Sequence, residues 1–159
     1  KNYSNQENIF FENSAISVNN EINKLFKVDK NKLELYDEHI KGITSFKIAH
    51  LIKHGVSKSH IVEEKVNSLS INNLIEKYSL NQIDLLMLDT EGYDCEIVID
   101  FLSNNASRPF IILEYIHSTH ESFKKLLKIL EIKEYKYVKI DENLFCFPKE
   151  FQNLEKIFN

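Results

Sequence analysis

Two carboxylates, Asp89 and Glu91, follow a short apolar run and are the residues of this chain best placed to do chemistry. The run begins at Ile83 and stops at Asp89, and Gly92 follows Glu91 before a helical pattern resumes. An apolar run this short predicts a strand buried on both faces of a sheet that helices cover. The carboxyl ends of such strands are where α/β proteins bind ligands. Carboxylates at that position can accept a proton or bind a hydroxyl group.

A simpler interpretation is that Asp89 only caps the helix that opens near Tyr93, since aspartate is a favoured N-cap residue. A second apolar run, residues 110–113, also ends on an acid, Glu114, and His117 follows it. A histidine can exchange a proton near neutral pH, which makes His117 a candidate base. A lone histidine after a strand is, however, more often a surface or capping residue.

The rest of the chain supplies the elements that must position these side chains. Strand patterns cover residues 9–11, 24–28, 61–66, 83–89, 110–114, 135–140 and 144–147, and helix patterns cover residues 44–54, 71–78, 93–103, 119–130 and 148–158. Thr44 or Ser45, Ser70, and Ser118 or Thr119 are the expected caps of three of these helices. The alternation between residues 70 and 131 predicts an α/β fold with a mainly parallel sheet, and the last two strands predict an antiparallel edge.

Composition narrows the class of protein. The 159 residues suffice for one domain, residues 1–159, with 43% hydrophobic and 28% charged residues. A formal net charge of -4 argues against a nucleic acid as the partner. No apolar stretch is long enough for a membrane span and no signal peptide opens the chain, so we expect no membrane partner and a cytoplasmic location. Cys95 and Cys146 do not indicate a disulfide scaffold.

One pair of residues has a spacing known from metal sites. His50 and His54 lie four apart on an expected helix, as zinc-binding histidines do. No glutamate adjoins His50 and the sequence reveals no third ligand, so we predict no metal site.

Three segments, residues 66–74, 83–92 and 111–114, together resemble the second half of an FkbM-type methyltransferase. The segment IDLLMLDTEG at 83–92 is the most specific of them, although Met87 and the pair Tyr93-Asp94 depart from the common pattern. The resemblance implies the Rossmann-like fold of S-adenosylmethionine-dependent class I methyltransferases. It also implies O-methylation of a small molecule or a sugar hydroxyl.

The resemblance implies roles for particular residues. The residues expected at the cofactor S-adenosylmethionine are Glu12, Asn13, Ser14 and Asp89. The expected catalytic residues are Asp89, Glu91 and His117, and those expected at the acceptor are Ser45, Tyr93 and Glu114. The segment 12–14 has an alternative interpretation, because its residue types are also ordinary turn formers.

The glycine-rich loop that this fold uses for its nucleotide is absent, because the chain has only Gly42, Gly55 and Gly92 and no G-x-G. By the resemblance, residues 9–11 are the third strand of the sheet. We therefore expect a longer natural protein whose first two strands and glycine loop precede Lys1. The strand at 83–89 should then be an exposed edge or pair with another chain, as in a homo-oligomer. The alternative function is a non-catalytic or degenerate α/β module that binds or assembles.

Overall fold

A computed structural model describes residues 8–18 and 23–151 of the chain. Its strands are β1 (Ala15–Ile16), β2 (Asn23–Val28), β3 (Thr44–Ser45), β4 (Ile61–Val66), β5 (Ser68–Leu69), β6 (Leu85–Leu88), β7 (Phe110–Glu114), β8 (Tyr135–Ile140) and β9 (Asn143–Pro148). Its α-helices are α1 (Glu38–Lys41), α2 (Ile48–Lys53), α3 (Ile71–Lys77), α4 (Asp94–Asn104) and α5 (His120–Ile132). Two 3-10 helices are η1 (Lys30–Leu35) and η2 (Lys58–His60).

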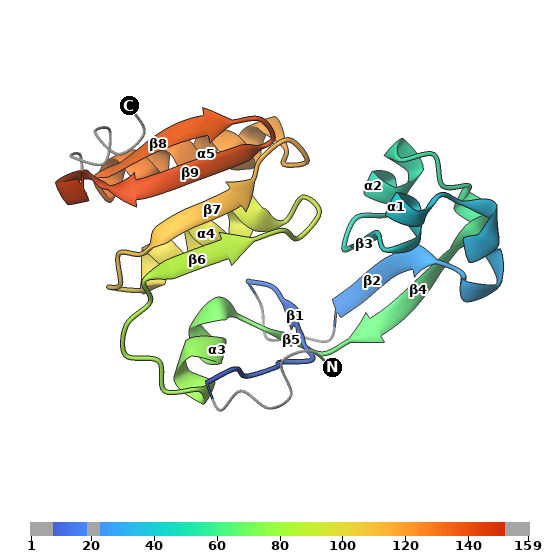
Figure 1. Cartoon of the computed structure of the whole chain (residues 1–159), viewed down its shortest axis with the longest axis horizontal. Helices are drawn as coiled ribbons and strands as arrows, with labels where there is room; N and C mark the ends of the chain where they lie inside the picture. The colour runs from blue at the N-terminus through green and yellow to red at the C-terminus, as the bar shows by residue number, and fades with distance from the viewer. Residues whose placement is uncertain (1–7, 19–22, 152–159) are drawn as a thin grey trace.

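The carboxyl-terminal half forms a sheet of four strands in the order β6-β7-β9-β8. β6 and β7 are parallel, and β9 runs antiparallel to both of its neighbours, β7 and β8. Helices α4 and α5 lie together on one face of the sheet, and the carboxyl ends of β6 and β7 point toward α2 (Figure 1).

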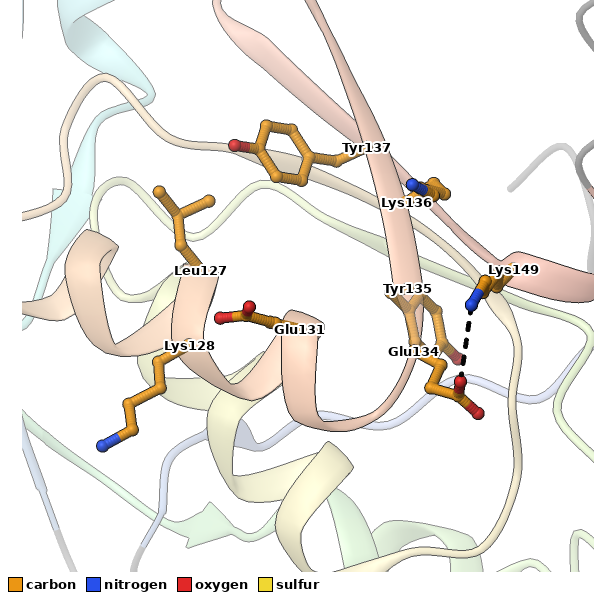
Figure 2. A pocket seen from close by; sticks show the side chains of 8 residues that line it. All are labelled: Leu127, Lys128, Glu131, Glu134, Tyr135, Lys136, Tyr137 and Lys149. Atoms are coloured by element: carbon orange, nitrogen blue, oxygen red, sulfur yellow. Dashed lines mark ion pairs between the residues drawn. The ribbon is translucent and has the colours of Figure 1, made fainter.

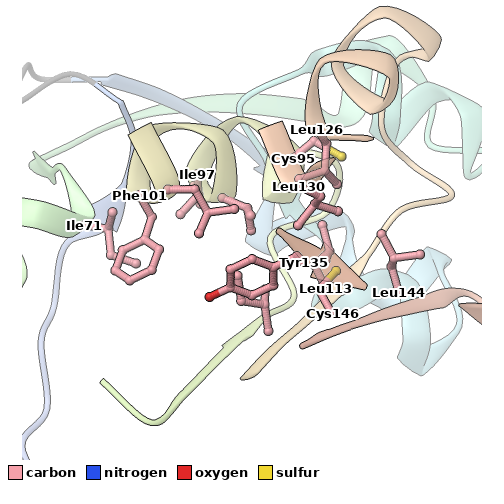
Figure 3. Close-up of a cluster of buried hydrophobic side chains, with 13 residues drawn as sticks. Ile71, Cys95, Ile97, Phe101, Leu113, Leu126, Leu130, Tyr135, Leu144 and Cys146 are labelled. Atoms are coloured by element: carbon pink, nitrogen blue, oxygen red, sulfur yellow. The ribbon is translucent and has the colours of Figure 1, made fainter. Parts of the chain in front are cut away.

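A hydrophobic core fills the space between this sheet and its two helices. Phe101 from α4, Leu126 from α5 and Leu113 from β7 have no exposed surface. Figure 3 shows how side chains from α4, α5 and the sheet converge there. Burying a side chain of this size contributes about 1.5–3 kcal/mol, so this core holds the β6–α4 and β7–α5 loops in place.

The opposite face of β6 is open among the described residues. Leu85 is 54% exposed and Met87 is 70% exposed, whereas Leu86 and Leu88 alternate with them and pack against the core. The prediction that this strand is buried on both faces is therefore wrong. Within the described sheet β6 is an edge strand, because β7 is its one neighbour, and whether it pairs with another chain stays a prediction.

The amino-terminal part of the described chain builds a second group of elements. β2 pairs antiparallel with both β3 and β4, and α1 and α2 lie beside this ribbon (Figure 1). Its own core consists of Val28, Ile40, Ile43, Leu51 and Val56. A short parallel pair, β1 with β5, joins residues 15–16 to residues 68–69.

The structure corrects three further sequence-based predictions. The sheets are not mainly parallel, because only the β1–β5 and β6–β7 pairs are parallel among the described strands. Residues 9–11 form no strand, and the first described strand begins at Ala15. The helix expected from residue 44 begins at Ile48, because Thr44 and Ser45 pair with β2 and so cannot cap it.

Other predictions are confirmed. β4, β7, β8 and β9 lie where the strand patterns place them, and α3, α4 and α5 agree with theirs to within a few residues. Ser70 and Thr119 cap their helices by accepting bonds from Asn73 N and Ser122 N. Most of the expected helix at 148–158 lies outside the described residues. None of the helices in the described ranges combines the length and the apolar character that crossing a bilayer requires.

Candidate active site

The loop that joins β6 to α4 has an unusual backbone. Glu91 has a φ of 53° and Gly92 a φ of 97°, so the chain passes through the left-handed region twice. A non-glycine residue in that region stores strain and often marks a functional site. Asp89, the residue just before this turn, is exposed.

A buried carboxylate keeps the loop in shape. Asp94 has no exposed surface, and one of its oxygens accepts a bond of 2.8 Å from the hydroxyl of Thr90. Burial raises the pKa of Asp94 above its ordinary value. The N-cap residue of helix α4 is Tyr93, and its side chain makes no capping bond. The carboxylate that bonds to the loop before this helix is that of Asp94, whereas the capping interpretation assigned such a role to Asp89.

Two neighbouring segments close on this loop. Ser45 Oγ donates to the carbonyl of Glu91 at 3.2 Å, and Lys47 Nζ donates to the carbonyl of Gly92 at 2.8 Å. On the other side, a Cβ on Gly92 would lie 2.8 Å from the carbonyl oxygen of His117. Only a glycine lets the two loops approach this closely.

A cleft of about 540 Å³ opens beside the loop. Its walls come from five separate parts of the chain, which are the segment 12–16, Leu25 of β2, residues 42–46 around β3, Val66 of β4 and the loop after β6. The residues predicted from sequence that line it are Glu12, Asn13, Ser14, Ser45, Asp89 and Glu91. The structure therefore brings together all four residues expected at the cofactor.

Glu12 is held in a fixed, charged state at one end of the cleft. Its carboxylate accepts bonds from Ser14 Oγ at 2.7 Å, Lys77 Nζ at 2.5 Å and Tyr78 OH at 2.9 Å. The bond from Lys77 is the main reason why the pKa of Glu12 falls to about 2. The polar segment 12–14 is thus a built part of the cleft wall.

Glu114 and His117, expected at the acceptor and in catalysis, lie beside the cleft and do not line it. Glu114 Oε1 and His117 Nε2 are 3.7 Å apart, and both side chains are more than four-fifths buried. Burial, followed by the neighbouring charges of Glu91 and Asp89, raises the pKa of Glu114 to about 7. Burial also lowers the pKa of His117. Such displaced values are common where residues do chemistry.

Tyr93, which was predicted to contact the acceptor, lies outside the lining of the cleft. Its ring lies edge-on against Phe46 with ring centres 5.3 Å apart. Burial raises the pKa of its hydroxyl.

Sequence reasoning missed a cluster of histidines next to the cleft. His50 Nε2 lies 2.8 Å from Glu91 Oε2, and the rings of His54 and His117 both lie against His50, each with a centre-to-centre distance of 4.6 Å. Burial lowers the pKa of His50, although Glu91 opposes this shift. The spacing of His50 and His54 was the available signal, but the other members are distant in sequence.

A second hollow, of about 610 Å³, lies at the far end of the sheet between α5 and β8 (Figure 2). Lysines and glutamates line it together with two tyrosines and a leucine, and an ion pair of 3.7 Å joins Lys149 to Glu134. Although it is larger, none of the predicted site residues lies in it. The strained loop and the convergent polar side chains make the cleft at Asp89 the better candidate.

These features define an α/β protein with a polar cleft at the carboxyl end of strand β6, and the carboxyl ends of strands are where α/β proteins bind their ligands. The chain matches the family model described as the methyltransferase FkbM domain over residues 2–138, and it belongs to this methyltransferase family. No curated protein and no solved structure is significantly similar to it.

Proposed function

We propose that this protein is an S-adenosylmethionine-dependent methyltransferase that acts on a hydroxyl group of a small molecule or a sugar. The observation that carries this proposal is the cleft in which Glu12, Asn13 and Ser14 face Asp89 from a distant part of the chain. These are the residues that the family resemblance assigns to the cofactor, and membership of the FkbM family supports the same reaction class.

The charges around the cleft suit a cationic donor. The methyl donor carries a positive sulfonium, and the exposed carboxylate of Asp89 lies at the end of β6, with Glu91 beside it. Opposite charges attract more strongly in a cleft than in bulk water because the effective dielectric constant is lower. Asp89 therefore is our first candidate for the residue that faces the donor.

Methyl transfer itself requires little chemical help. The acceptor oxygen forms a bond to the methyl carbon while the carbon–sulfur bond breaks, its electron pair stays on sulfur, and the acceptor proton passes to a base. The protein must hold oxygen, carbon and sulfur in line and accept that proton. Asp89 is the first candidate base and Glu91 the second, while His117 and Glu114 lie close enough to shape the acceptor pocket.

Turnover of the full-length protein tests this proposal. Transfer of a labelled methyl group from S-adenosylmethionine to a panel of sugars and hydroxylated small molecules identifies an acceptor. We expect Asp89→Asn to lower the rate by about 100-fold or more, the size of a general-base contribution. Asp84→Asn, an exposed aspartate before the other end of β6, is the matched control and should keep normal turnover. Normal turnover in the Asp89 variant would remove this residue from the mechanism.

We further propose that additional strands of the natural protein pair with the free edge of β6. The support is that β7 is the one neighbour of β6 in the described sheet. The coding sequence upstream of Lys1 tests this. A strand followed by G-x-G and then a second strand ending on an acid is the expected finding, and a start codon directly before Lys1 would contradict it.

The same exposed strand favours a second candidate function, a non-catalytic module that assembles through its sheet edge. An unpaired strand edge with apolar side chains is a template for pairing with another chain, including a second copy. Light scattering of the purified chain distinguishes the two. A dimer that Met87→Lys converts to a monomer, together with no binding of S-adenosylhomocysteine by the full-length protein, would favour the module.

A further inference from the structure

The cluster beside the cleft has the composition of a metal centre. His50 and His54 come from α2, Glu91 from the loop after β6, and His117 from the loop after β7. One ligand atom from each of the four side chains can be chosen so that all four lie within 4.8 Å of one another. Four donors from three distant segments converge on one point.

His50 is buried, His54 and His117 are partly buried, and two of the histidine nitrogens lack a partner. The side chain of His50 is 6% exposed and that of His117 is 11% exposed. His54 Nε2 and His117 Nδ1 are buried and have no hydrogen-bond partner among the residues that the structure describes. Buried polar groups in folded proteins are nearly always bonded, so two unpartnered nitrogens on members of this cluster indicate a ligand.

We propose that His50, His54, His117 and Glu91 bind one divalent transition-metal ion, for which Zn²⁺ is the best-suited candidate. Imidazole nitrogens with a carboxylate oxygen are the donors that zinc accepts, and magnesium and calcium prefer all-oxygen sites. The separation of four residues between His50 and His54 places both rings on one side of a helix, as in known zinc pairs.

The geometry requires only small adjustments of side chains. Four ligands about 2.1 Å from a tetrahedral Zn²⁺ lie about 3.4 Å from one another. The contact of 2.8 Å between His50 Nε2 and Glu91 Oε2 must open slightly, and the widest pairs, up to 4.8 Å, must close. Rotations about side-chain bonds cover both changes, so the backbone can stay in place.

The surroundings hold these donors together and favour a cation. Bonds from Ser45 and Lys47 fix the strained loop that carries Glu91, and Gly92 lets that loop lie against His117. The carboxylate of Asp89 adds negative charge nearby, opposed by the ammonium groups of Lys47 and Lys53. Because Glu91 also lines the cleft, the metal ion would lie at the cleft wall. Any part it plays in orienting an acceptor hydroxyl rests on the proposed function, whereas its binding does not.

Metal titration of tag-free, full-length protein tests the proposal. After treatment with a chelator, calorimetry with ZnCl₂ should give one ion per chain, and Co²⁺ should give the intense visible absorption of a four-coordinate site with nitrogen and oxygen ligands. We expect His54→Ala and His117→Ala each to weaken Zn²⁺ binding by at least about tenfold, the loss that even outer-shell changes can cause. His120→Ala, an exposed histidine three residues beyond His117, is the matched control and should bind normally.

Each outcome decides the question. If the wild-type protein binds no Zn²⁺ stoichiometrically, or if both variants bind as the wild type does, the site does not exist. If a variant fails to fold, as far-ultraviolet circular dichroism would show, the Co²⁺ spectrum of the wild type decides alone, and a six-coordinate or absent spectrum overturns the proposal. The titration needs neither cofactor nor acceptor, so its failure is distinguishable from failure of the methyltransferase proposal.

Discussion

Replacement of Gly92 by alanine probes the contact between the loop after β6 and the loop after β7. The new Cβ would lie 2.8 Å from the carbonyl oxygen of His117 and 3.3 Å from its carbonyl carbon. The φ of 97° at this position is also unfavourable for any residue with a Cβ. The substitution therefore introduces backbone strain and a steric clash together.

The two other glycines of the chain separate these effects. Gly55 has a φ of 86° with no atom within 4 Å of an added Cβ, so Gly55→Ala introduces the strain alone. Gly42 has a φ of -89° and is equally open, so Gly42→Ala introduces neither effect. Strain in the left-handed region costs about 1–2 kcal/mol, and overpacking adds about 1–3 kcal/mol. We expect losses of about 3 kcal/mol for Gly92→Ala and about 1.5 kcal/mol for Gly55→Ala, and a small gain of up to about 1 kcal/mol for Gly42→Ala.

Thermal and denaturant unfolding measure the expected order of stability among the three glycine variants. For a domain of this size, 3 kcal/mol corresponds to a fall in Tm of roughly 6–12 °C. Because the contact also positions His117 against Glu91, Gly92→Ala should weaken Zn²⁺ binding as well, whereas Gly55→Ala should not. A Gly92 variant no less stable than the Gly55 variant would refute the close approach of the two loops.

Three further predictions concern the cleft and the sheet. The carboxylate of Glu12, whose pKa falls from 4.5 to about 2 through Lys77, stabilises the fold fully above pH 4.5 and loses this effect as the pH falls toward 2. Glu12→Gln should therefore lower Tm at pH 7, and the difference from wild type should shrink in thermal scans at pH 3. Asp94→Ala removes the buried acceptor to which the hydroxyl of Thr90 donates. It should lower the free energy of unfolding in urea by about 1–3 kcal/mol. An unchanged free energy would mean that the loop does not depend on Asp94. Met87→Lys on the open face should change the free energy of unfolding by less than about 0.5 kcal/mol. Leu113→Ala on the core face should lower it by about 2–5 kcal/mol. Equal effects of the two variants would contradict the assignment of the two faces of the sheet.

Local patterns in the sequence predict most of the carboxyl-terminal half correctly. The strand Phe110–Glu114 is an apolar run that ends on an acid, and α5 has apolar residues at helical spacing. Thr119 caps α5 through a bond from Ser122 N, which is close to it in the chain. In each case the interactions that determine the element lie close together in the chain, so the local sequence pattern predicts its type and position.

The incorrect predictions depend on partners that are distant in sequence. Thr44 and Ser45 look like helix caps, yet they pair with Phe26 and Lys27 of β2. The apolar residues of β6 look like a fully buried strand, yet their burial depends on what lies on the open face. Propensity is a weak guide wherever such tertiary contacts decide the outcome.

The residues of the candidate site likewise include some that the local sequence reveals and others that only the fold brings together. The acid at the end of β6 is visible in the sequence because it interrupts an apolar run at Asp89. The histidine cluster is not, because His117 follows His54 by 63 positions, and only the fold brings the two residues together. Asp94 was equally hidden, since nothing in its neighbours shows that its carboxylate is buried.

The central claim is that the cleft between residues 12–14 and the loop 89–91 receives the methyl donor. A crystal structure of the full-length protein with S-adenosylhomocysteine tests it most directly. We expect the ligand in this cleft, with its sulfur near the carboxylate of Asp89. Ligand density in the hollow between α5 and β8, or a cleft that stays empty at saturating ligand, would contradict it.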